Sequence, residues 1–230
     1  MLQHRRLVGW VTVLSGVIGL VSYVLVAGAV NYNFEFFGDS SLIFTTDGVN
    51  SAMLKWSMIT DVFGYYLLLL PVLFFIHEWL NGQSAWRNMI SFCGLSYIIA
   101  GAIGASVLSA ASPALLDKFP MASPEQQDII KLSFHTLSWV VVDGIWNMFD
   151  ALVFAVWFIS IGIFLKVRHA FWGWLTILIG LLSALDFMGN IFDVKSLAEA
   201  ALNLYLILAP LWAILIGFKI LQNKIFLSHA

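Results

Sequence analysis

Four aspartates interrupt long apolar segments of the sequence and are the residues most able to do chemistry: Asp61, Asp143, Asp150 and Asp186. A carboxylate among apolar side chains must be protonated, bind a cation or accept hydrogen bonds, because burying an unpaired charge is costly. No Lys or Arg lies at a matching position within these segments. The chemistry that they suggest is therefore binding of a cation, a proton or a small polar ligand.

Two of these aspartates belong to a stripe of polar and aromatic residues. Its members follow one another at intervals of four, four, four and three residues: His135, Trp139, Asp143, Asn147 and Asp150. Residues three or four apart share one face of a helix. This segment therefore presents a polar face, and the most economical way to shield that face from lipid is to turn it toward other helices.

Shorter polar stripes occur in two other segments. One contains Ser57, Asp61 and Tyr65, and the other contains Ser183, Asp186 and Asn190. Together the three stripes predict an outward-opening acidic pocket that binds a small ligand or a cation. The residues predicted to line it are Asp61, Tyr65, His135, Asp143, Asn147, Asp150, Asp186 and Asn190.

The composition indicates where these segments lie. Of 230 residues, 61% are hydrophobic and only 10% are charged, whereas a soluble domain carries about 25% charged residues. The net charge of −2 excludes the basic excess of a nucleic-acid-binding protein, and a single cysteine excludes an intrachain disulfide or a zinc site built on several cysteines. The chain is therefore predicted to be a membrane protein in contact with a lipid bilayer.

Six segments are long and apolar enough to cross a bilayer as helices, which requires about 20 residues each. They cover residues 7–30, 56–80, 89–111, 138–165, 171–192 and 200–221. The fourth helix is expected to begin earlier, at Pro124, because Ser123, Pro124 and Gln126 form a typical helix start. The predicted fold is an all-α polytopic bundle, with residues 1–230 as a single membrane domain.

The distribution of basic residues predicts the orientation of the bundle. With the N-terminus in the cytoplasm, seven Lys and Arg fall on the inner side and four on the outer side, as the positive-inside rule requires. Six spans also place the C-terminus in the cytoplasm. In this orientation Asp61, Asp143 and Asp186 lie close to the outer surface, and Asp150 lies near the middle of the bilayer.

The first and fifth spans open with similar sequences. Residues 9–16 and 173–180 match at Gly, Trp, Thr, Leu and Gly. An internal repeat is typical of transporters, whose binding sites lie between repeats.

Three functions remain open on the sequence alone. The first is a binding protein or small transporter for a ligand or cation. The second is an intramembrane enzyme that uses Asp143, Asp150 and His135 with a metal. The candidate metal ligands are His135, Asp143 and Asp186. The third is an accessory protein whose polar residues only join helices, within a homo-oligomer or with a partner membrane protein.

Several motifs together resemble a known family. They are Arg6 to Thr12 at the start of the first span, Ser57 to Tyr65 in the second, and Gly173 to Gly180 in the fifth. The combination, over about residues 5–221, is similar to a large group of uncharacterised bacterial inner-membrane proteins defined by a domain of unknown function. The resemblance implies an all-helical fold in the bacterial cytoplasmic membrane and implies no activity.

Overall fold

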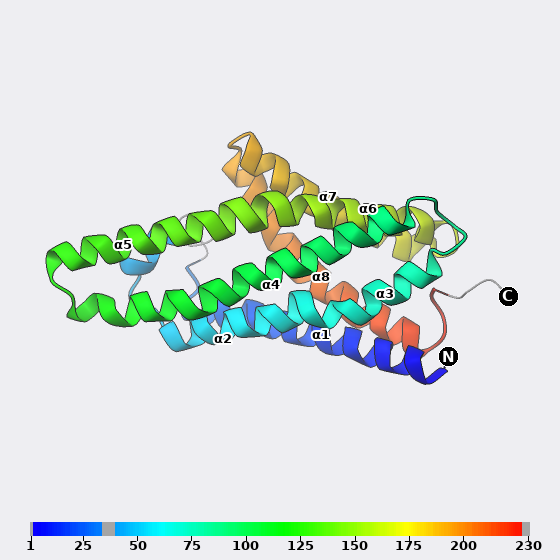
Figure 1. Ribbon diagram of the computed structural model, residues 1–230, viewed down its shortest axis with the longest axis horizontal. Helices are drawn as coiled ribbons and strands as arrows, with labels where there is room; N and C mark the ends of the chain where they lie inside the picture. The colour runs from blue at the N-terminus through cyan, green and yellow to red at the C-terminus, as the bar shows by residue number, and fades with distance from the viewer. Residues whose placement is uncertain (1, 34–39, 227–230) are drawn as a thin grey trace.

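The computed structural model describes residues 2–33 and 40–226, and these residues form helices and no strands (Figure 1). Six helical segments are long and apolar enough to cross a membrane: His4–Ala29, Ser51–Trp79, Arg87–Met121, Pro124–Lys166, Ala170–Ile191 and Lys195–Leu221. The predicted all-α fold with six spans is confirmed. The six apolar helices fit a multi-pass membrane protein.

Several spans consist of more than one helical element. The elements are α1 (Leu2–Ala29), η2 (Ser40–Phe44), α2 (Ser51–Asp61), η3 (Val62–Tyr66), η4 (Leu67–Leu69), α3 (Leu70–Trp79), α4 (Arg87–Lys118), η5 (Phe119–Met121), α5 (Pro124–Ser138), η6 (Trp139–Asp150), α6 (Ala151–Lys166), α7 (Ala170–Ile191) and α8 (Lys195–Leu221). The elements α2 to α3 form the second span and the elements α5 to α6 form the fourth.

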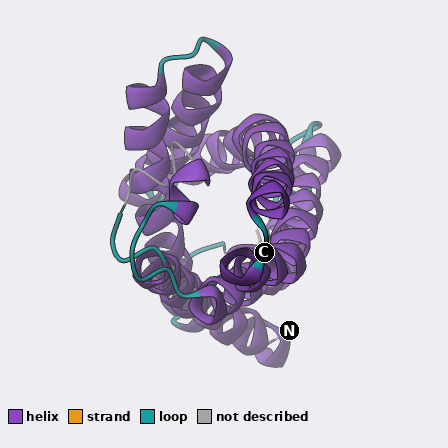
Figure 2. Cartoon of the chain, turned by 90° about the vertical axis from the view of Figure 1, so that its left-hand side faces the viewer, coloured by secondary structure: helices purple, strands orange, loops and turns teal. Residues whose placement is uncertain are grey.

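The six spans form a closed ring. Each span packs against the next one in the sequence, and α1 closes the ring by packing along α8. Figure 2 is a view along the axis of the ring and shows helices on all sides of its centre. The start of α1 and the end of α8 lie at the same end of the ring (Figure 1). Which end faces the cytoplasm stays a prediction from the charge distribution.

Glycines allow the closest helix contacts in the ring. A Cβ atom on Gly16 of α1 would lie 2.3 Å from the carbonyl oxygen of Pro210 in α8. On Gly173 of α7, it would lie 2.3 Å from the backbone of Lys166 at the end of α6. Both glycines belong to the two similar sequence stretches, so both stretches use small residues to bring a neighbouring helix close.

The end of the ring that carries both termini is filled by a hydrophobic core. Its largest fully buried side chains include Trp157, Phe158, Leu73 and Trp212. The indole Nε1 of Trp212 donates a hydrogen bond of 2.8 Å to the hydroxyl of Thr176. Dense apolar packing therefore blocks this end of the ring.

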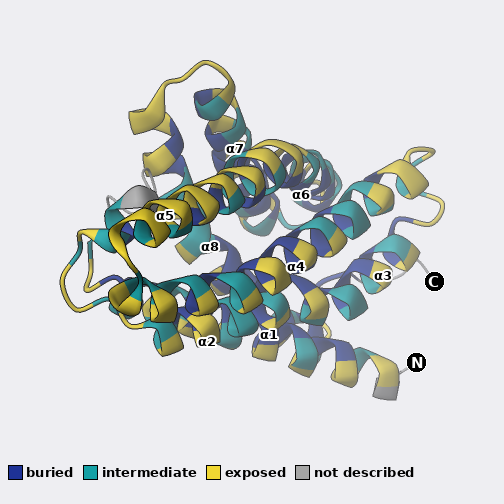
Figure 3. Cartoon of the chain, turned by 60° about the vertical axis from the view of Figure 1, so that its left-hand side comes forward, coloured by how far each residue is buried: buried dark blue, intermediate teal, exposed yellow. Residues whose placement is uncertain are grey.

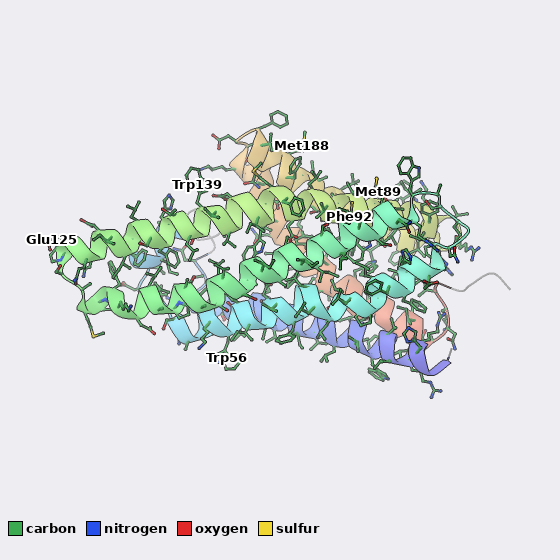
Figure 4. All side chains as sticks on the ribbon, viewed as in Figure 1. Trp56, Met89, Phe92, Glu125, Trp139 and Met188 are labelled. Carbon is green, nitrogen blue, oxygen red and sulfur yellow. The ribbon has the colours of Figure 1, made fainter. Side chains whose placement is uncertain are left out.

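The outward faces of the spans are apolar and exposed in the isolated chain. Trp56, Phe92, Met89 and Met188 are examples (Figure 4). Buried residues instead face the interior of the ring (Figure 3). This is the arrangement expected of a bundle surrounded by lipid.

Two spans depart from regular α-helix. In the second span, the π-helical element η3 and the 3-10 element η4 separate α2 from α3. Pro71 near the start of α3 lacks an N–H donor, and its ring crowds the carbonyl four residues earlier, which disfavours a continuous helix there. In the fourth span, the twelve residues of η6 are π-helical.

The fourth span begins as the sequence predicts. α5 starts at Pro124, and the side chains of Ser123 and Gln126 each bond the backbone of the other residue in a capping box. Most residues of α5 are exposed (Figure 3). The capping box thus satisfies two backbone N–H groups at the start of a helix that runs directly into the ring.

Replacing Gly16 with Ala should destabilise the ring, because the new methyl group would overlap the backbone of α8. Overpacking of this kind costs about 1–3 kcal/mol, and we expect the melting temperature of the purified protein to fall by several degrees. Gly28→Ala on the same helix is the control, since its Cβ would meet only the flexible end of the Met53 side chain. Equal melting temperatures for the two variants would contradict the close α1–α8 contact.

Candidate functional site

A cavity of about 500 Å³ lies inside the ring and is lined by residues of all six spans. Of the residues that the sequence predicts for the pocket, seven line this cavity: Asp61, Tyr65, His135, Asp143, Asn147, Asp150 and Asp186. Asn190 does not. The structure thus brings together three polar stripes that are far apart in the sequence.

The cavity is wider than the three-helix pocket that the sequence predicts. The first span contributes Ser22 and Tyr23, the third contributes Tyr97 and Ser112, and the sixth contributes Tyr205. These spans reach the cavity because α1 and α8 close the ring. The contact between the first and last spans could not be read from local sequence patterns.

The polar stripe of η6 faces the cavity. Trp139, Asp143, Asn147 and Asp150 follow one another at intervals of three or four residues, so they fall on one side of the fourth span. All four line the same cavity.

Asp150 occupies an unusual environment. Its side chain is 5% exposed and lines the cavity. Carboxylate oxygen Oδ2 accepts a hydrogen bond of 3.4 Å from the hydroxyl of Tyr66. The other oxygen, Oδ1, has no hydrogen-bond partner among the described residues. A buried oxygen without a protein partner is rare and is usually explained by a bound water, ion or ligand.

Three tyrosines surround this carboxylate, and the sequence analysis did not identify them as site residues. They form what we call the tyrosine cluster: Tyr66 of η3, Tyr97 of α4 and Tyr205 of α8. The hydroxyls of Tyr97 and Tyr205 lie 2.8 Å apart, and the rings of Tyr66 and Tyr97 lie 5.1 Å apart. The only available signal was that each tyrosine interrupts an apolar span, where a hydroxyl needs a partner.

Two of the other three aspartates have asparagine partners. Asn190 donates hydrogen bonds of 2.9 Å to both the backbone oxygen and Oδ1 of Asp186. Asn147 donates a long hydrogen bond of 3.5 Å to Asp143. Asn190 therefore supports Asp186 from outside the cavity, which explains why it is absent from the lining.

The lining extends to exposed residues at the end of the ring opposite the termini. His135 and Trp139 are exposed there, with their rings stacked at 6.5 Å, and Lys195 lies near them on the lining. Lys131 also lies near this end but forms an ion pair of 3.8 Å with Asp128. Solvent thus meets the cavity at the end that the sequence predicts to face outward.

The cavity does not assemble a metal site. Within residues 2–33 and 40–226, no group of three or more His, Cys, Asp or Glu side chains is placed to hold a metal ion. The candidate ligands His135, Asp143 and Asp186 therefore line one cavity without converging on a common point.

Comparison with known proteins found no match: no family model, no curated protein and no solved structure is significantly similar to this chain. The resemblance to bacterial inner-membrane proteins therefore stays an expectation from the sequence motifs. Function can therefore be inferred only from the geometry of the cavity.

A thiol placed in the cavity should react with a water-soluble reagent added from outside the cell. We expect Ser112→Cys in a Cys93→Ser background to be modified by a membrane-impermeant methanethiosulfonate trimethylammonium reagent. Ser112 is buried but lines the cavity. Modification is measured by the loss of subsequent labelling with a fluorescent maleimide.

Ser15→Cys in the same background is the control, because Ser15 is buried against the backbone of Gly64 and does not line the cavity. Reaction at Ser112→Cys only from the cytoplasmic side would reverse the predicted orientation. Reaction from neither side would contradict a solvent-accessible cavity.

Proposed function

We propose that this chain is a multi-pass membrane protein that binds a small, positively charged ligand in the cavity of the ring, opening outward. The observation that carries the proposal is Asp150, a buried carboxylate on the cavity wall with one oxygen that no described residue satisfies. A positively charged ligand would supply both the missing hydrogen bond and the compensating charge.

The other aspartates strengthen the attraction for a cation. Asp61, Asp143 and Asp186 also line the cavity, and Lys195 at the exposed end is the only Lys or Arg on its wall among the described residues. Field lines concentrate in a cleft with low-dielectric walls, so several carboxylates there raise the local concentration of cations. The charge balance of the wall favours a cation over an anion.

An accessory role without a site accounts less well for these features. A protein whose aspartates only join helices would be expected to satisfy their oxygens and to fill the space between them. Asp186 fits that expectation, since Asn190 bonds it. Asp150 does not, and a cavity of about 500 Å³ has the size of a small-molecule site.

Transport is the form of this function that the interrupted second span favours. Transporters commonly bind their substrates beside broken membrane helices. Here, η3 and η4 interrupt the second span directly beside Asp61, on the cavity wall. The packed core at the other end of the ring would then be the part that opens toward the cytoplasm. We place the chain, as a single domain with both termini inside, in the bacterial cytoplasmic membrane.

A cation should stabilise the purified protein against heat, and loss of the cavity carboxylates should remove the effect. We expect at least one of sodium, calcium, tetramethylammonium and benzylammonium chloride to raise the melting temperature. Ligand at 100 times its Kd contributes about 2.7 kcal/mol, or about 5–10 °C for a chain of this size. The double variant Asp61→Asn, Asp150→Asn should show no such rise.

Asp128→Asn is the matched control, because Asp128 is an exposed aspartate on α5 outside the cavity. Size-exclusion chromatography establishes that each variant is folded before melting is measured. The proposal fails if no cation stabilises the wild type, or if the double variant responds as the wild type does.

A further inference from the structure

We infer that the ligand is an organic ammonium compound with an apolar body, whose charged nitrogen binds Asp150 within the tyrosine cluster. This inference rests on the proposed function and specifies its ligand class. Three observations support it: the polar groups available on the cavity wall, the aromatic surroundings of Asp150 and the size of the cavity.

The polar groups on the cavity wall suit an ammonium group better than a metal ion. Hard metal cations such as Ca²⁺ take six to eight oxygen ligands, and the described residues contain no group of three acidic, His or Cys side chains placed for a metal. An ammonium group needs only one carboxylate acceptor together with weaker polar or aromatic partners. Oδ1 of Asp150 is such an acceptor.

Aromatic rings surround Asp150 at the deep end of the cavity. Phe154 follows it by one helical turn, and its ring lies 4.7 Å from that of Tyr97 and 4.9 Å from that of Tyr205. Tyr66 bonds the carboxylate itself. The faces of aromatic rings attract cations, and recognition of organic ammonium groups by aromatic cages is a well-established use of this attraction.

The tyrosine hydroxyls are already directed at one another and at Asp150. The hydroxyls of Tyr97 and Tyr205 bond each other, and the hydroxyl of Tyr65 donates to the backbone oxygen of Leu206. In the pair formed by Tyr97 and Tyr205 only one hydroxyl donates, so the other keeps its O–H. Tyr66 and Tyr97 are buried and Tyr205 is half-buried, so the ring of Tyr205 is the part of the cluster that a ligand in the cavity meets most directly.

The rest of the cavity has room for an apolar body. A volume of about 500 Å³ lies within the range of small-molecule sites and far exceeds what a single ion needs. Leu54, Met58, Leu108 and Leu202 line it together with Phe134. An ammonium compound with a hydrocarbon or aromatic group would bury that group against these side chains while its nitrogen reaches Asp150.

Binding of a matched series of compounds to the purified full-length protein tests this ligand class. The probes are benzylammonium chloride, neutral benzyl alcohol of similar size and shape, tetramethylammonium chloride and sodium chloride. Dissociation constants are measured by thermal shift and by isothermal titration calorimetry in the same detergent. We expect benzylammonium to bind at least tenfold more tightly than each of the other three.

Two cavity variants and a surface control locate the interaction. Asp150→Asn should weaken benzylammonium binding at least tenfold. Asp61→Asn should weaken it less, because Asp61 lies on the same wall without being the acceptor. Asp128→Asn should leave it unchanged. If Asp150→Asn does not fold, the comparison of benzylammonium with benzyl alcohol and the response of Asp61→Asn still decide the inference.

The outcomes separate this inference from the function on which it rests. If sodium or tetramethylammonium binds through Asp150 and benzylammonium does not, the cation site stands and the ligand class is wrong. Equal binding of benzyl alcohol and benzylammonium would likewise overturn the ammonium assignment. If none of the charged probes binds, both the inference and the proposed function fail.

Discussion

The cost of placing an ionisable side chain among apolar helices governs the organisation of this protein. A carboxylate at bilayer depth costs about 2.5–3.5 kcal/mol even on insertion scales, so it must face the interior of the bundle and find partners. Asp61, Asp143, Asp150 and Asp186 all do face the interior. Asp186 obtains its partner from Asn190 one turn away, whereas one oxygen of Asp150 has none among the described residues. The proposed site therefore centres on Asp150, whose oxygen Oδ1 lacks a partner among the described residues.

The ring architecture is what gives these side chains a common space. Close contacts at Gly16 and Gly173 bring neighbouring helices together at the wall, while the bulky core of Trp157, Phe158 and Trp212 fills only one end. At the other end, two spans depart from regular α-helix beside the cavity. Such π-helical turns occur often at functional sites.

Local patterns in the sequence predict much of this arrangement, and contacts between distant segments account for the rest. Hydropathy gives the six spans because every backbone group in lipid must bond within its own helix. The spacing of three and four residues predicts the polar stripe of the fourth span, because all of its side chains lie on one helix. The tyrosine cluster joins Tyr66, Tyr97 and Tyr205 from three spans, and no local pattern shows that these segments meet. The π-helical winding of η6 was likewise not predicted from the sequence.

The length of the fourth span has a consequence outside the bilayer. Its 43 residues would extend over about 64 Å as a regular α-helix, whereas a membrane with its headgroups is about 40–45 Å thick. Most residues of α5 are exposed, and α5 lies beside the end of α4 at the left of Figure 1. In a bilayer of that thickness, the beginning of α5 is expected to project into the aqueous phase.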